Sequence, residues 1–205
     1  MRTASQVVSV VLHPLVMPTF GLLCYYSLFP MIAQLNDVHL FFQIFLRVLL
    51  FTLFLPLASV MVMMRFGKVS TMFIEDKRER SWPLLLAAGI YLITYYFVLP
   101  VPPVPGFISI FILGAAGALI LALLINLKWK ISLHMIGIGG LCGALTILYF
   151  YLQEGNPLWL SIWFILAGVL GTARLLLNAH TATQILAGFA LGFAAEFSLA
   201  YLAIT

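Results

Sequence analysis

The stretch FISIFILGAAGALILALLINL, residues 107–127, decides the fold class of this chain. It contains no charged residue along its whole length. As an α-helix it would be about 32 Å long, which matches the hydrocarbon core of a bilayer, about 30 Å thick. Lipid offers no hydrogen-bond partners to backbone N–H and C=O groups, so a segment of this kind must be helical. We therefore predict a transmembrane helix here.

The remainder of the chain repeats this pattern. Of the 205 residues, 64% are hydrophobic and only 8% are charged, whereas a soluble domain carries about 25% charged residues. Further apolar runs cover about 7–33, 40–64, 83–100, 132–152, 158–176 and 181–203. We therefore predict an all-α fold, a polytopic transmembrane helix bundle of six or seven spans. Residues 1–205 are expected to form a single integral-membrane domain.

Basic residues gather on one side of the predicted membrane. Seven spans would place the N-terminus and the loops around 65–82, 128–131 and 177–180 on a common side, here called the basic face. Every lysine and arginine except Arg47 belongs to it: Arg2, Arg65, Lys68, Lys77, Arg78, Arg80, Lys128, Lys130 and Arg174. Cationic loops of membrane proteins usually face the cytoplasm. The pattern predicts a multi-pass protein of the plasma (inner) membrane whose basic, active face is cytoplasmic.

Small residues recur at helical spacing in the later spans. Gly139 and Gly143 form a G-x-x-x-G pair, and Gly188 and Gly192 form another. Small residues let helix backbones approach closely in a bilayer. We interpret these glycines as packing seams between helices, not as sites.

Three polar segments occur on the basic face: EDKRERSWP (75–83), KWKISLHMIG (128–137) and GTARLLLNAHTATQILAGF (171–189). His134 and His180 each fall at the start of a predicted helix, where free N–H groups and the helix dipole attract anions. Arginine binds phosphate through two hydrogen bonds at once, and two histidines allow one nucleophile and one general acid. Together these residues suit phosphoryl transfer from a membrane-embedded substrate.

The third segment resembles a motif of the type 2 phosphatidic acid phosphatase family, which is related to the vanadium haloperoxidases. That family's third motif reads S-R-x5-H-x3-D. Here Ala173, Arg174, His180 and Gln184 occupy the same frame. His180 and Gln184 are four residues apart and share one helical face, so the amide can hydrogen-bond the imidazole.

The other two segments resemble the family's remaining motifs in the same order. Its second motif, P-S-G-H, is similar to ISLH at Ser132 and His134. Its first motif, K-x6-R-P, is similar to EDKRERSWP, where Lys77 and Arg80 supply the two cations after a shift of register. The resemblance covers residues 65–200, which we expect to form a phosphatase-like core.

The resemblance implies a lipid phosphate phosphatase, a phosphoric monoester hydrolase that works through a covalent phosphohistidine. His180 would attack phosphorus, Gln184 would orient it, and His134 would protonate the leaving lipid alkoxide. The phosphate oxygens would be held by Arg174, Arg80, Lys77 and Ser132. The substrate would be a lipid phosphate or pyrophosphate of the phosphatidic acid, phosphatidylglycerophosphate or polyprenyl type. The family's reaction needs neither a metal nor another cofactor.

Gln184 supports an alternative interpretation. The family's aspartate carries a charge that stabilises the nucleophilic histidine, whereas Gln184 is neutral; in a Ser-His-Asp triad the same kind of replacement costs about 10⁴-fold in rate. The alternative is a catalytically weak or inactive relative that binds a phospholipid head group or acts as a membrane-complex subunit. In both interpretations the expected partners are a membrane lipid phosphate and the lipid bilayer, with no nucleic acid, and a homodimer is left open.

Three polar residues receive no role from the sequence: His13, Arg47 and Glu196. His13 is expected to pack near the basic face. Glu196 lies deep in the last predicted span, where an ionisable side chain normally has a partner.

Overall fold

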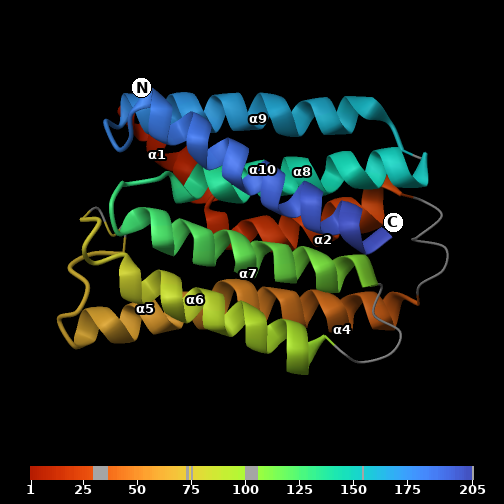
Figure 1. Ribbon diagram of the computed structural model, residues 1–205, viewed down its shortest axis with the longest axis horizontal. Helices are drawn as coiled ribbons and strands as arrows, with labels where there is room; N and C mark the ends of the chain where they lie inside the picture. Colours follow the sequence, from red (N-terminus) through yellow and green to blue (C-terminus); the bar gives the residue numbers. More distant parts are fainter. Residues whose placement is uncertain (30–36, 73, 75, 100–105, 154, 205) are drawn as a thin grey trace.

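The computed structural model describes residues 1–29, 37–72, 74, 76–99, 106–153 and 155–204, and these residues form an all-α bundle without strands (Figure 1). The first helices are α1 (Arg2–Val11), the 3₁₀ turn η1 (Pro14–Val16), α2 (Met17–Leu28), α4 (Val38–Leu49), the π-helical turn η2 (Leu50–Phe54) and α5 (Leu55–Arg65). They are followed by α6 (Ser81–Ile93), the π-helical turn η3 (Thr94–Val98), α7 (Gly106–Asn126), α8 (Leu133–Leu152), α9 (Pro157–Leu176) and α10 (Ala182–Ile204).

Six helical stretches in the described residues are long and apolar enough to cross a membrane. They are Arg2–Leu28, Val38–Arg65, Gly106–Asn126, Leu133–Leu152, Pro157–Leu176 and Ala182–Ala203. The stretch expected at about 83–100 is a shorter apolar helix, Ser81–Phe97. The predicted ends near 33 and 100 lie outside the described residues. The chain is therefore a multi-pass helical membrane protein, as its composition predicts.

The first span is broken where the sequence places a proline. Pro14 has no N–H group to continue an α-helix, so α1 ends at Val11 and the chain turns through η1 before α2 begins. His13 occupies the break, and its ring Nδ1 accepts a hydrogen bond from the backbone N–H of Leu15 over 3.3 Å. The break thus holds an imidazole in a fixed orientation.

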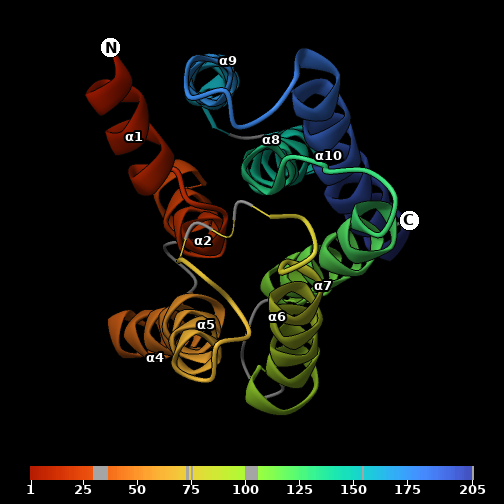
Figure 2. The same ribbon diagram turned by 90° about the vertical axis from the view of Figure 1, so that its left-hand side faces the viewer.

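Helix α8 is the most buried of the six spans and packs along α10 (Figures 1 and 2). Gly139 and Gly143 of α8 lie against the backbone of α10, and Gly188 and Gly192 of α10 lie against the backbone of α8. A Cβ atom at Gly143 would stand only 3.0 Å from the Cα of Phe193. The glycine pairs are therefore a reciprocal packing seam, as their spacing predicts.

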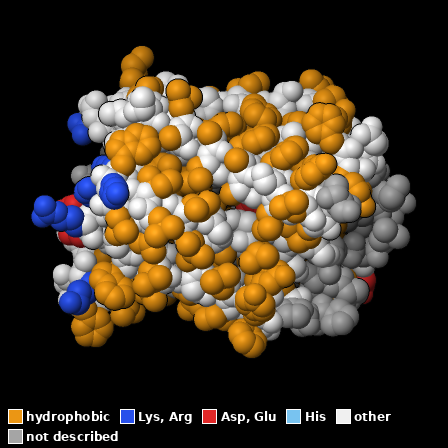
Figure 3. All heavy atoms as spheres, viewed as in Figure 1, with side chains coloured by type: hydrophobic (Ala, Val, Ile, Leu, Met, Phe, Trp, Pro, Cys, Tyr) orange, Lys and Arg blue, Asp and Glu red, His pale blue; other side chains and the backbone are white. Residues whose placement is uncertain are grey.

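The charged side chains and the apolar surface are separated along the bundle axis. Lysine and arginine side chains gather at the left-hand end in Figure 3, and hydrophobic side chains cover the face between the two ends. Many large apolar side chains of the described helices are about half exposed, among them Phe54, Leu121 and Ile165. Such a belt is suited to contact with lipid. Figure 2 views the bundle from the basic end.

Candidate functional site

A cavity of about 180 Å³ lies inside the bundle and reaches the basic end. Three imidazoles and two guanidiniums line it there: His13, His134, His180, Arg80 and Arg174. These side chains come from the α1–η1 break, the start of α8, the α9–α10 turn, the start of α6 and the end of α9. The structure therefore brings together cationic and imidazole groups that are remote along the chain.

His180 is held in the turn between α9 and α10. Asn178, two residues earlier, adopts a left-handed conformation with φ 53°, which asparagine tolerates better than most residues. The ring Nδ1 of His180 lies 3.1 Å from Oε1 of Gln184, and the backbone N–H of Thr181 donates to the same atom over 3.1 Å. The backbone donor requires an acceptor at that position, so the amide atom is oxygen.

This contact determines the tautomer of His180. Because Oε1 can only accept, Nδ1 of His180 must carry the proton, and Nε2 keeps its lone pair. Burial is the main cause that lowers the pKa of His180, to about 4 from its ordinary value of 6.5, and the hydrogen bond that the ring donates to Gln184 partly opposes it. The nearby charges of Arg80, Arg174 and Lys130 lower that pKa further. At neutral pH the ring is therefore uncharged and able to act as a nucleophile through Nε2.

His134 has the opposite tautomer. It stands in the first turn of α8, and its Nε2 lies 3.0 Å from the backbone carbonyl of Ser9. A carbonyl only accepts, so Nε2 is protonated and the neutral ring keeps its lone pair on Nδ1. The ring can therefore release a proton from Nδ1 only when it is doubly protonated.

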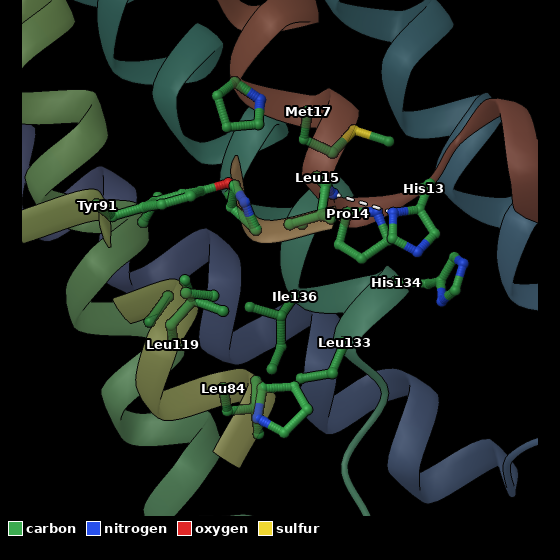
Figure 4. Close-up of a pocket in the computed structure, with 18 of the residues that line it drawn as sticks. His13, Pro14, Leu15, Met17, Leu84, Tyr91, Leu119, Leu133, His134 and Ile136 are labelled. Atoms are coloured by element: carbon green, nitrogen blue, oxygen red, sulfur yellow. Dashed lines mark hydrogen bonds between the residues drawn. The ribbon is translucent and has the colours of Figure 1, made fainter. Parts of the chain in front are cut away.

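His13 is the site residue that sequence reasoning missed. Its ring packs edge-on against His134, with 5.3 Å between the ring centroids (Figure 4). Since Nδ1 accepts from Leu15, the neutral ring carries its proton on Nε2. No motif in the sequence marks His13; the signal was the His-Pro break close to the basic face.

The two arginines are fixed by backbone and hydroxyl groups. Arg80 is 6% exposed, and its guanidinium donates to the carbonyls of Ile74 over 2.9 Å and Ile131 over 3.4 Å. Ile74 has φ 42°, a strained conformation for a β-branched residue that is often found at functional sites. Arg174 donates from Nη1 to Oγ of Ser9 over 3.2 Å. Both guanidiniums are therefore placed at the cavity wall before any ligand arrives.

Helix N-termini add to the positive potential of this end. Helices α6, α8 and α10 all begin at the basic end, and each has a residue at its start in the cavity wall: Arg80, Leu133 and His180. Unpaired N–H groups and the helix dipole stabilise an anion at such ends. The polar end of the cavity is consequently suited to a phosphate group.

Two predicted phosphate ligands do not line the cavity. Lys77 instead donates from Nζ to the backbone carbonyl of Lys128 over 3.2 Å. Ser132 is fully buried against Gly188 in the α8–α10 seam. Gln184 contacts the cavity only through His180.

Apart from Tyr91 and Glu196, the rest of the cavity is lined by apolar side chains. It continues between α5, α6, α7 and α8 along Leu84, Leu119 and Ile136 (Figure 4). An anion-binding end followed by an apolar channel matches an amphiphilic ligand.

Within the described ranges, no three His, Cys, Asp or Glu side chains cluster closely enough to hold a metal ion. No protein-family model, curated protein or solved structure matches the chain.

Proposed function

We propose that this protein is an integral-membrane phosphatase that releases phosphate from a lipid phosphate or pyrophosphate through a phosphohistidine. One observation carries the proposal: His180, His134, Arg80 and Arg174 line the polar end of a single cavity whose remainder is apolar. The four residues belong to the segments that resemble the phosphatase motifs. An active site of this kind needs its nucleophile, acid and phosphate ligands in one place.

In the proposed reaction, the lone pair on Nε2 of His180 attacks phosphorus and forms an N–P bond. The bond from phosphorus to the lipid oxygen breaks, and the leaving alkoxide takes a proton from Nδ1 of doubly protonated His134. Water then attacks phosphorus and gives a proton to Nδ1 of His134, which is again doubly protonated. The N–P bond breaks, and inorganic phosphate leaves with His180 neutral again.

Arg80 and Arg174 would bind the phosphate oxygens and stabilise the charge that develops on them. Preorganised donors of this kind usually make the largest contribution to lowering such a barrier. The apolar part of the cavity would receive the start of the lipid chain. The substrate class is thus a phosphatidic acid-, phosphatidylglycerophosphate- or polyprenyl-type lipid, presented from the bilayer.

One observation favours a second candidate function, the binding of a phospholipid head group with little or no turnover. The partner of His180 is the neutral Gln184, which sets the tautomer but adds no negative charge to stabilise the imidazolium. In this case the cavity would hold the lipid phosphate and leave it intact.

Phosphate release from purified protein separates the two candidates. We expect wild-type protein in nanodiscs to release phosphate from at least one member of a panel of lipid phosphates, and His180→Ala to release none. His39→Ala, at the opposite end of the bundle, is the matched control and should keep full activity. Saturable lipid binding without release from wild-type protein would favour the binding function.

For localisation, we propose the inner membrane with the basic end in the cytoplasm. The cations outside the cavity wall support this, because Arg2, Arg65, Lys68 and Lys128 obey the positive-inside rule without a role in the site.

A further inference from the structure

Glu196 is a buried acidic side chain in the wall of the cavity, remote from the phosphate-binding end. It is 3% exposed, and its Oε2 has no hydrogen-bond partner among the residues that the structure describes. Leaving a buried acceptor unsatisfied costs about 1–3 kcal/mol. Ionisable residues inside membrane proteins are usually kept for function. Oε2 of Glu196 is therefore available to accept a hydrogen bond from a ligand, since no described residue supplies one.

The surroundings of Glu196 are shaped to hold its carboxyl group. Gly114 of α7 lies against the carboxyl, where a Cβ would overlap Oε2, and a Cβ at Gly140 of α8 would stand 3.1 Å from Cγ of Glu196. Any larger residue at Gly114 would displace the carboxyl group. Two neighbouring helices thus make room for this one side chain.

Tyr91 is the nearby polar side chain from which a hydrogen bond to Glu196 could be expected. Its hydroxyl proton, however, already takes part in another hydrogen bond. Its hydroxyl donates to the backbone carbonyl of Thr52 over 3.1 Å. Thr52 lies in the π-helical turn η2, and such turns leave backbone carbonyls without their regular partners. A hydroxyl has only one proton to donate, so Tyr91 cannot also donate to Glu196.

The distance of Glu196 from the polar end of the cavity determines where along a ligand its hydrogen-bond donor would lie. Gly140, which faces Glu196, is six residues after His134 on α8, or about 9 Å farther along the helix axis. An extended chain advances about 1.2 Å per bond. A ligand whose phosphate lies at His134 therefore reaches Glu196 after roughly seven or eight bonds.

We propose that the cavity selects a lipid phosphate that carries a hydrogen-bond donor, a hydroxyl or an amide N–H, at the start of its apolar chain, and that Glu196 accepts from this donor. The proposal rests on the lipid-phosphate ligand proposed above, but not on its hydrolysis. The first carbons of an acyl chain attached to a glycerol phosphate fall at this depth. A hydroxyl on the third carbon of the acyl chain is therefore in reach of Glu196.

Binding of uncleavable phosphonate analogues tests this directly. One analogue of phosphatidic acid has plain acyl chains, the second has a hydroxyl on the third carbon of each chain, and the third has its hydroxyl near the methyl end. We expect wild-type protein in phosphatidylcholine nanodiscs to bind the second analogue about three- to tenfold more tightly than the others. Equal affinity for all three analogues would overturn the proposal.

Two pairs of variants assign the preference to Glu196. Glu196→Gln keeps an acceptor oxygen and should retain the preference, whereas Glu196→Leu should abolish it while plain-chain binding persists. Gly114→Ala should also abolish it by displacing the carboxyl group, and Gly117→Ala, which has open space around its Cβ position, should retain it. A preference that survives both Glu196→Leu and Gly114→Ala would contradict the role of Glu196.

The outcome is separable from that of the proposed function. The protein could release phosphate from plain phosphatidic acid and yet bind the three phosphonates equally. This result would support the phosphatase and overturn the chain selection. A Glu196-dependent preference without phosphate release would support the chain selection and contradict the proposed phosphatase activity. Failure to bind any of the phosphonates would overturn the chain selection, whereas the phosphatase would be overturned by a lack of phosphate release from every lipid phosphate in the panel.

Discussion

At the scale of single residues, the contact between His180 and Gln184 determines what the site can do. It gives Nδ1 the proton and leaves Nε2 available, and burial keeps the ring neutral. In the proposed reaction, however, the amide would not offset the positive charge that the ring acquires on bonding to phosphorus. The rate of phosphohistidine formation should therefore respond to charge at position 184.

The pH dependence of turnover follows from the pKa of His180. Only the neutral ring can attack, and burial lowers its pKa to about 4. We expect kcat/KM to fall as the pH drops through about 4 and to be unaffected by His180 between pH 5 and 7. An acidic limb centred near pH 6.5 would contradict the buried, neutral state of this ring.

Gln184→Glu tests the effect of charge with little change of shape. A carboxylate at the same 3.1 Å distance would stabilise the imidazolium, so we expect the pKa of His180 to rise and the acidic limb to move to higher pH. Phosphate release should increase about tenfold or more. Gln184→Leu, which removes the hydrogen bond, should lower release; equal rates for all three proteins would show that residue 184 does not orient the nucleophile.

At the scale of the helices, the seam between α8 and α10 positions both motif histidines. His134 lies at the start of α8 and His180 just before α10. Separation of these two helices would move one imidazole away from the other. The glycine seam therefore links helix packing to the geometry of the cavity.

Gly143→Ala should weaken this seam. The added Cβ would stand within 3.0 Å of the Phe193 backbone, and overpacking of this kind costs about 1–3 kcal/mol. We expect a lower Tm in detergent, together with lower phosphate release. Gly117→Ala is the matched control because its Cβ would meet no atom within 4 Å; the same Tm loss in both variants would argue against a specific seam.

The helices could be predicted from the sequence for a physical reason. A long apolar run in lipid must be helical, because lipid offers no hydrogen-bond partners to the backbone. The sequence spacing of Arg174 and His180 also placed them on either side of the connection between α9 and α10. The position of His13 in the cavity wall could not be predicted, because it depends on the break at Pro14 and on the packing of α1 beside α9. The contact of Lys77 with the carbonyl of Lys128 likewise depends on a loop conformation that residue types do not encode.

At the scale of the whole molecule, the separation of charge at the two ends predicts the orientation in the membrane. The positive-inside rule places Lys68 in the cytoplasm and His39 on the other side. In a protein whose Cys24 and Cys142 are replaced by serine, Lys68→Cys should resist an impermeant thiol reagent in intact cells and His39→Cys should react. The reverse pattern would place the basic end outside, and the proposed substrates would then be lipid phosphates of the outer leaflet.

Glu196 illustrates a limit of sequence reasoning at this scale. Its position in an apolar span was evident, but the cavity it lines is formed by several helices and could not be inferred from any one of them. Whether Oε2 has a hydrogen-bond partner among the described residues depends on how α7 and α8 pack against α10.

The most direct test of the central claim is the capture of a phosphoenzyme. Purified protein is incubated with a lipid phosphate labelled on phosphorus, quenched in alkali, which preserves phosphohistidine, and the label on the protein is counted and mapped. We expect acid-labile label on His180 in wild-type protein and no label in His180→Ala. Phosphate release without labelled protein, or label that persists in His180→Ala, would contradict it.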